Sequence, residues 1–218
     1  MDNLLLTGVV AVVVAGAAML VAILSARQRN VDYRIQRVAA LGDAQFVRSL
    51  SGLVRMKFSA SNRIALLKNG EEAFPAMFAA VRGAQSSITF ENYVYWSGRI
   101  GYEFANLLAD KARQGIGVHV IVDWAGSLTM DRESLRLMKQ SGVEVHFYHR
   151  PRFGGLHRLN HRTHRRELVV DGRVGFTGGI GFADQWSGDC AKHCRRDNHY
   201  RIEGPLVGDM QAVFMKTG

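Results

Sequence analysis

Strand patterns and helix patterns alternate along residues 63–149, which restricts the chain to a small set of folds. Residues 118–123 form a nearly continuous apolar run, which is typical of a strand covered on both faces. Apolar residues at helical spacing, in residues 74–81 and 104–112, lie on either side of a β-branched and aromatic segment. This repetition predicts an α/β fold in which helices flank a mixed or parallel sheet.

The same patterns predict the edge of the sheet at which a site would lie. A helix near residues 132–140 precedes a strand at 143–149. Ligands of such sheets bind beyond the carboxyl ends of the strands. The turn that begins at Asp123 offers Gly126 and Ser127 at that edge.

The N-terminal segment carries a long run without charge. Residues 4–24 contain no charged side chain, and a helix needs roughly 20 apolar residues to cross a bilayer. A cleaved signal peptide, the competing interpretation, usually begins with basic residues, whereas this chain begins with Asp2 and no Lys or Arg. We therefore expect residues 1–25 to form one transmembrane anchor. The arginines that follow would place the next domain in the cytoplasm.

The rest of the chain divides into a linker and a folded domain. Residues 26–60 read as a basic juxtamembrane linker with some helical character, and residues 61–218 as the domain. The net charge of +9 and the pI of about 10.0 favour polyanionic partners: acidic lipid head groups, nucleic acid or phosphate substrates.

The chain has two cysteines, Cys190 and Cys194, which are too few for a disulfide framework. Their spacing argues against a mutual disulfide, so both are expected to be reduced. A metal site that includes His193 is the alternative, and it would need further ligands.

One loop concentrates positive charge and imidazole. Residues 149–166 contain six arginines, four histidines and no acidic residue. Imidazole solubilises a surface weakly and titrates near neutrality, so this composition favours a phosphate-handling site. A merely solvated basic loop is the alternative.

The loop leads into an H-x-R-x4-D arrangement of His164, Arg166 and Asp171. On a strand, the first two residues point to the same face and can reach one phosphate. Imidazole is a competent nucleophile toward phosphorus, and guanidinium can bind two phosphate oxygens. Asp171 could hold a histidine in the required tautomer, and residues 177–179 could bring backbone amides close to a phosphate. By spacing alone, these charges could also simply flank a strand.

The stretch resembles the HKD motif of the phospholipase D superfamily, H-x-K-x4-D-x6-G-G/S-x-N. More narrowly, "NHRTHRRELVVDGRVGFTGG", "ADQW" and "RRDNHYRIEGPLV" resemble the first half of a bacterial cardiolipin synthase, and the likeness covers roughly residues 60–215. The resemblance implies that the motif histidine attacks a phosphodiester and becomes a phosphohistidine. A histidine of a second motif then acts as general acid, and an alcohol takes the phosphatidyl group. Donor and acceptor are both phosphatidylglycerol, and no metal or organic cofactor is required.

Carried over by resemblance, His164 is the nucleophile, Arg166 occupies the phosphate-binding lysine position and Asp171 is the motif aspartate. Gly178 and Gly179 match the glycine pair of the phosphate-binding turn. 

Two further positions matter to the comparison. Asp197 matches an acidic residue that supports a histidine in relatives, and we group it with the phosphate-binding residues. The usual asparagine is replaced by Gly181, and the usual lysine by Arg166, which keeps the charge but lacks the compact ammonium group.

The chain contains one such motif, whereas sites of the superfamily need two. We therefore expect either a fragment, truncated after its first half, or two copies that pair as a homodimer. The leading hypothesis is a single-pass enzyme of the bacterial inner membrane that makes cardiolipin from phosphatidylglycerol. The alternatives are a one-motif nuclease or phosphodiesterase, whose basic loop would hold nucleic acid, and an inactive fragment that binds anionic lipid.

Overall fold

The computed structural model describes residues 2–25, 40, 43–55, 58–150, 162–188 and 194–217. The chain separates into two compact units, Met1–Lys57 and Phe58–Gly218, and each is described by itself. Most of the basic loop expected at 149–166 lies outside the described residues, as do Cys190 and His193.

The first unit contains two helices, α1 (Asp2–Ser25) and α2 (Ala44–Val54). Part of the expected linker is therefore helical. Within the residues that the structure describes, no helix combines the length and the apolar character needed to cross a membrane. The transmembrane anchor expected at residues 1–25 is not confirmed and stays a prediction.

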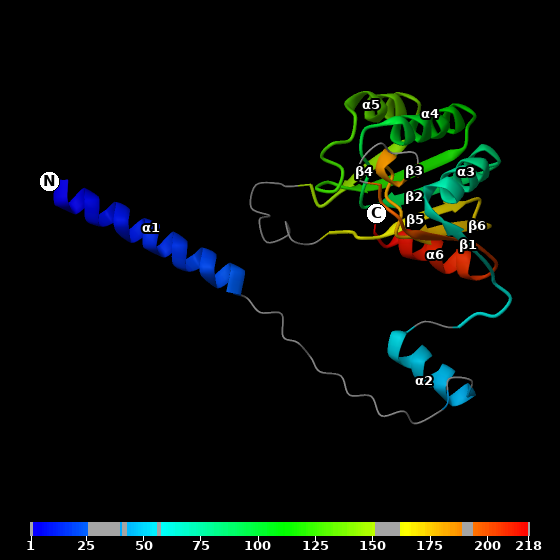
Figure 1. The fold of residues 1–218 in the computed structure, drawn as a ribbon, viewed down its shortest axis with the longest axis horizontal. Helices are drawn as coiled ribbons and strands as arrows, with labels where there is room; N and C mark the ends of the chain where they lie inside the picture. The colour runs from blue at the N-terminus through cyan, green and yellow to red at the C-terminus, as the bar shows by residue number, and fades with distance from the viewer. Residues whose placement is uncertain are drawn as a thin grey trace. The chain divides into compact units, whose positions relative to one another are not determined.

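The second unit is built on one seven-stranded sheet in the order β1-β7-β6-β5-β2-β3-β4 (Figure 1). Strands β2, β3 and β4 are mutually parallel, and every other neighbouring pair is antiparallel. The predicted mixed sheet is thus confirmed. The strands are β1 (Arg63–Lys68), β2 (Ser87–Asn92), β3 (Gly117–Asp123), β4 (Glu144–Tyr148), β5 (Arg166–Val170), β6 (Val174–Gly178) and β7 (Asn198–Glu203).

Helices cover both faces of this sheet. Figure 1 shows α3, α4 and α5 on one side and α6 on the other. The predicted helix near 132–140 is confirmed as α5, whose N-cap Asp131 accepts a hydrogen bond from the backbone N–H of Ser134. The helices of this unit are α3 (Asn69–Arg82), α4 (Arg99–Arg113), α5 (Arg132–Gln140), α6 (Leu206–Met215) and the short 3-10 turn η2 (Asp184–Trp186).

The main core lies between the sheet and helices α3 and α4. Phe90, Phe104 and Phe182 meet at its centre, with ring centroids 4.4–4.8 Å apart. Strand residues alternate between the two faces, so Leu168 enters this core whereas Val169 packs under α6. Each Å² of buried apolar surface stabilises the fold by about 25 cal/mol. A one-residue slip would move these side chains to the opposite face of the sheet, so their burial fixes the register of the strands.

Two expectations need correction. The β-branched and aromatic segment between the first two helices, residues 86–96, is expected to be a strand throughout, but the strand ends at Asn92. The side-chain oxygen of Asn92 accepts a hydrogen bond from the N–H of Val94 and turns the chain there. Cys194 is disulfide-bonded, so the expectation that both cysteines stay reduced is wrong.

Candidate active site

The sheet topology gathers the candidate residues at one edge. This edge is formed by the carboxyl ends of β2, β3, β4 and β6 and by the amino ends of β5 and β7. It includes the carboxyl ends of the three parallel strands, where sheets of this class bind ligands. His164 and Arg166 lie here, and so does Asp123, the last residue of β3.

The end of β2 positions the motif histidine and arginine. Arg166 is half-buried and pairs with Asn92 across the β2–β5 ladder. The exposed imidazole of His164 lies against the ring of Tyr93, with centroids 4.6 Å apart. His164 and Arg166 therefore both lie beside the end of β2. Because His164 precedes β5, the common strand face expected for the two residues stays a prediction.

A second histidine lies beneath this surface, and sequence reasoning missed it. His199 of β7 is 2% exposed and pairs with Gly178 of β6. Within the described part of the chain its Nδ1 has no hydrogen-bond partner. Burial, followed by the nearby charge of Arg166, lowers the pKa of His199 to about 4, so its imidazole is neutral at physiological pH. The short "D-x-H" after the glycine pair was the available signal.

The glycine pair makes room for two side chains. A Cβ atom at Gly178 would come within 2.7 Å of Nδ1 of His199. A Cβ atom at Gly179 would overlap the carboxylate of Asp197. The backbone N–H of Gly179 donates to the carbonyl oxygen of Asn198 at 3.0 Å. This amide is therefore already used by a hydrogen bond within the fold, and the expected approach of the amides of residues 177–179 to a phosphate stays a prediction.

Arg166 is the cation around which these groups collect. Burial lowers its pKa, while the charge of Asp197 and the hydroxyl of Tyr93 act in the opposite direction. The guanidinium stays charged, because arginine titrates far above neutrality. Its Nε is buried and donates to no acceptor among the described residues. A cation with an unused buried donor favours an anionic ligand at this edge.

Asp171 lies at the opposite end of β5. Its carboxylate accepts hydrogen bonds from the backbone N–H groups of Gln85, Ser86 and Ser87 and from the hydroxyl of Ser86. Arg165 and the five residues of β5, at about 3.3 Å each, separate it from His164. The suggestion that it holds the tautomer of a histidine at this site is wrong, because the carboxylate instead secures the start of β2.

A pair of buried carboxylates lies on the other face of the sheet at the same edge. Glu91 and Glu167 face each other across the β2–β5 ladder, and both are buried. The hydroxyl of Thr163 donates to Glu91, and the guanidinium of Arg165 lies 3.7 Å from its second oxygen. Burial, then the charge of Glu91, raises the pKa of Glu167 to about 7. Sequence analysis missed this pair, although an acid inside a β-branched strand is itself a signal.

Asp123 fixes the segment that carries the nucleophile candidate. Its carboxylate is fully buried and accepts hydrogen bonds from the N–H groups of Ala125, Gly126 and Thr163. The guanidinium of Arg162 lies 3.9 Å away. The segment before β5 is thereby held against the end of β3.

A small pocket opens beside His164. Its volume is about 200 Å³, below the roughly 300–1,000 Å³ of pockets that enclose whole drug-sized ligands. Three cations line it, and two of them, Arg162 and Arg165, also lie within 4 Å of the buried carboxylates of Asp123 and Glu91. The pocket has the size of a phosphodiester head group, and its lining is basic. The lining residues are Tyr148, Arg162, Thr163, His164, Arg165, Lys216 and Thr217.

Comparison with known proteins agrees with this geometry. No protein-family model matches the chain. The curated protein "Probable cardiolipin synthase YwiE" of Bacillus subtilis is 37% identical over 162 residues, which cover 73% of this chain and 32% of the relative. Cardiolipin synthase 1 of Bacillus cereus is 36% identical over 154 residues, 69% of this chain and 30% of the relative. Cardiolipin synthase A of Pseudomonas fluorescens is 32% identical over 171 residues, 77% of this chain and 36% of the relative.

Solved structures share the fold at low sequence identity. The phospholipase D family member Nuc of Salmonella typhimurium has a TM-score of 0.54 at 16% identity, covering 72% of this chain and 94% of Nuc. Phosphatidylserine synthase of Haemophilus influenzae has a TM-score of 0.55 at 16% identity, covering 70% of this chain and 36% of that chain.

The chain spans about a third of the length of the curated relatives that it matches. Its sequence agrees with cardiolipin synthases over most of the folded unit, and its fold agrees with a phospholipase D family member. Together, the comparisons support a cardiolipin synthase-like protein that has the fold of phospholipase D family members.

Proposed function

We propose that this chain forms half of the active site of an enzyme that makes cardiolipin from two molecules of phosphatidylglycerol, with His164 as the nucleophile. The observation that supports this most is the convergence on one sheet edge of an exposed imidazole and the partly unpaired cation of Arg166. A small basic pocket opens beside them. The cardiolipin synthases that the chain resembles agree in reaction class.

The proposed reaction has two displacements at phosphorus. In the first, a nitrogen of His164 forms a bond to phosphorus, the bond to the glycerol oxygen breaks, and an acid protonates the departing oxygen. In the second, a hydroxyl of another phosphatidylglycerol attacks phosphorus, loses its proton to a base, and releases His164 as cardiolipin forms. The acid and the attacking group lie on opposite sides of phosphorus. We therefore propose that a second motif, from a further segment or a second copy, supplies the acid.

The remaining residues of the edge bind and position. Arg166 is proposed to contact the phosphate oxygens, and Asp197 and the neutral His199 to hold its guanidinium. The neutrality of His199 matters, because a second positive charge beneath Arg166 would repel it. Asp171 is proposed to act through the fold only.

We also propose that residues 1–25 anchor the enzyme in the bacterial inner membrane, with the catalytic unit in the cytoplasm. The substrate is then an anionic lipid in the same membrane. The anchored protein should stay in the membrane fraction through high-salt and carbonate washes. Release by carbonate would leave a peripheral, basic protein instead.

The decisive test uses a substrate whose leaving group needs no acid. Phosphatidyl-p-nitrophenol releases p-nitrophenolate without protonation at neutral pH, so it isolates the role of His164 from that of a second motif. We expect one equivalent of p-nitrophenolate per chain and an acid-labile phosphatidyl adduct that mass spectrometry places on His164. Arg166→Lys should keep or raise the burst.

His164→Ala should abolish both the burst and the adduct, whereas His146→Ala, an exposed histidine on β4, should leave them unchanged. A burst that survives in His164→Ala would assign the nucleophile to another residue. Cleavage of single-stranded DNA, lost in the same variant, would favour a nuclease.

A further inference from the structure

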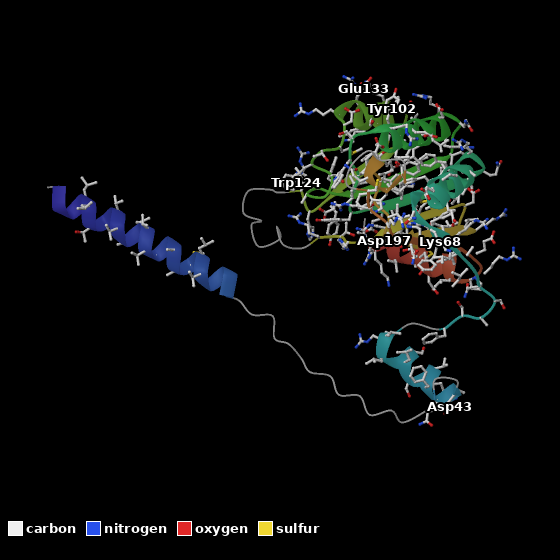
Figure 2. All side chains as sticks on the ribbon, in the orientation of Figure 1. Asp43, Lys68, Tyr102, Trp124, Glu133 and Asp197 are labelled. Atoms are coloured by element: carbon white, nitrogen blue, oxygen red, sulfur yellow. The ribbon has the colours of Figure 1, made fainter. Side chains whose placement is uncertain are left out.

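A groove separate from the His164 pocket lies between α5, the edge strand β4 and the loop after β3. Its volume is about 240 Å³, and its floor is apolar. Leu128, which also lines the groove, is 64% exposed. Figure 2 labels Trp124, which lines the groove from the loop after β3. The apolar lining residues are Trp124, Leu128, Met130, Leu135 and Phe147.

The rim of this groove is cationic. Arg132, Leu135 and Lys139 lie on one side of α5, because positions i, i+3 and i+7 share one side of a helix. The two cations therefore flank Leu135 along the helix. Arg150 completes the rim, and no acidic side chain lines the groove. Across the described residues, none of these three cations forms an ion pair with an acidic side chain. The groove therefore complements a ligand with an apolar part and an anionic part.

A buried hydroxyl in the groove lacks a partner. Ser127 is 4% exposed and lines the groove, and its Oγ makes no hydrogen bond within the described part of the chain. A buried hydroxyl without a partner destabilises the folded state, because it has lost its hydrogen bonds to water. Its backbone N–H donates to the carbonyl oxygen of Asp123, so the residue is held in place. The hydroxyl is positioned to contact an acceptor atom of a ligand.

The groove opens at the same end of the sheet as the candidate active site. Phe147 lines the groove and its neighbour Tyr148 lines the His164 pocket, so the two cavities lie on either side of the end of β4. A bilayer surface that meets this edge would therefore face both. An exposed leucine and a half-buried tryptophan beside a basic rim suit an anionic lipid surface.

We propose that this groove binds one molecule of anionic phospholipid. An acyl chain lies on the apolar floor, the phosphate lies between Arg132, Lys139 and Arg150, and the hydroxyl of Ser127 donates to an ester or phosphate oxygen. The proposal goes beyond the phosphatidyl transfer above, because the groove binds lipid whether or not that reaction occurs. Its function is to hold the reactive edge against the membrane.

The test is a titration of the full chain in phosphatidylcholine nanodiscs with dihexanoyl phosphatidylglycerol. The chain carries His164→Ala to prevent turnover, and tryptophan fluorescence is the readout. We expect a saturable signal that disappears in Trp124→Phe. Dihexanoyl phosphatidylcholine and glycerol phosphate should bind at least tenfold more weakly, because each lacks one of the two features that the groove recognises.

The variants separate a built groove from general attraction by charge. Arg132→Ala and Lys139→Ala should each weaken binding about tenfold, the effect of losing one charge-assisted hydrogen bond. Arg136→Ala removes the same charge from the same helix but does not line the groove, so it should change binding less than twofold. Ser127→Ala should weaken binding severalfold without lowering the melting temperature, because its hydroxyl has no partner to lose.

Three results would overturn the proposal: equal binding of phosphatidylcholine, equal binding of glycerol phosphate, or equal losses in Arg136→Ala and Arg132→Ala. The proposed reaction is judged separately, by the p-nitrophenolate burst. A normal burst without groove binding would reject the groove alone, and groove binding without a burst would reject the reaction alone.

Discussion

At the scale of single residues, two adjacent glycines, Gly178 and Gly179, leave room for His199 and Asp197 at the edge of the sheet that carries the candidate active site, here called the reactive edge. A side chain at either position would occupy the space of one of these groups. The backbone N–H of Gly179 is already bonded to the carbonyl oxygen of Asn198. Their value is steric, which explains why a motif for phosphate chemistry contains residues without side chains.

We expect Gly179→Ala to lower the p-nitrophenolate burst at least tenfold, because the added methyl group displaces the carboxylate of Asp197 from Arg166. Circular dichroism should show a folded protein. Gly208→Ala is the matched control, since no atom lies within 4 Å of its Cβ position and alanine suits a helix. Equal activity of Gly179→Ala and wild type would show that Asp197 has no role in the burst.

The buried pair Glu91 and Glu167 predicts an unusual pH dependence of stability. The pKa of Glu167 is raised from 4.5 to about 7, so the folded state binds more protons than the unfolded state between these values. The free energy of unfolding should therefore fall as pH rises from about 4.5 to about 7 and then level off.

We expect Glu167→Gln to remove most of this slope and to raise the melting temperature more at pH 8 than at pH 5. Thermal unfolding followed by circular dichroism at several pH values measures it. Glu133→Gln, an exposed change on α5, should leave the slope as in wild type. A slope that persists in Glu167→Gln would assign the proton to another group.

At the scale of elements, the two ends of β5 have different proposed roles: candidate catalytic residues lie at its amino end, and a structural carboxylate follows its carboxyl end. His164 and Arg166 lie at its amino end, and Asp171 follows its carboxyl end with a backbone φ of 53°. The carboxylate of Asp171 gathers the amides that begin β2, so the turn after β5 fixes the neighbouring strand. The motif thus joins a reactive edge and a distant anchor through one short strand.

We expect Asp171→Asn to destabilise the folded unit by about 1–2 kcal/mol, since hydrogen bonds to a charged acceptor are stronger than those to an amide. Asparagine tolerates a positive φ, so the change tests charge rather than backbone strain. Partial burial raises the pKa of Asp171, but the hydrogen bonds from residues 85–87 outweigh it and leave the pKa lowered. This stabilisation is present above the ordinary pKa of an aspartate and is lost as pH falls through the lowered value.

Urea denaturation measures the effect of Asp171→Asn, and its size should shrink in acid. The burst per folded molecule should stay close to that of wild type, because the carboxylate lies away from the reactive edge. Asp110→Asn, an exposed change on α4, is the control. Loss of the burst at unchanged stability would return Asp171 to the catalytic machinery.

At the scale of the whole molecule, the given sequence contains one H-x-R-x4-D motif, and with it one proposed nucleophile, His164. Displacement at phosphorus with glycerol as the leaving group needs an acid that His164 cannot provide while it attacks. A second motif is therefore needed because the acid and the nucleophile lie on opposite sides of phosphorus. The need applies to phosphatidylglycerol, whose leaving group must be protonated, and less to phosphatidyl-p-nitrophenol.

We expect the monomeric chain to react once with phosphatidyl-p-nitrophenol but to form little or no cardiolipin from phosphatidylglycerol. Light scattering of the solubilised chain establishes its oligomeric state, and thin-layer chromatography detects cardiolipin. Activity that appears only in a dimer fraction would agree with paired motifs. Robust cardiolipin formation by a proven monomer would contradict the requirement for a second motif.

Much of this protein followed from local pattern. Spacing of apolar residues predicted helices α3, α4 and α5, strands β2, β3 and β4, and a mixed or parallel sheet, but it did not predict β6, β7 or α6. The H-x-R spacing predicted that His164 and Arg166 share a face. These features depend on residues close together in sequence, whose relative placement is set by backbone geometry alone.

The tertiary structure decided which distant side chains meet. His199 lies under Arg166 because β6 and β7 pair beside β5, and Glu91 faces Glu167 because β2 pairs antiparallel with β5. Strand order and register, set by packing of the whole core, determine such contacts, and no short stretch of sequence contains them. For the same reason Asp171, which belongs to the same short motif as Arg166, lies at the opposite end of β5 and binds the backbone at the start of β2.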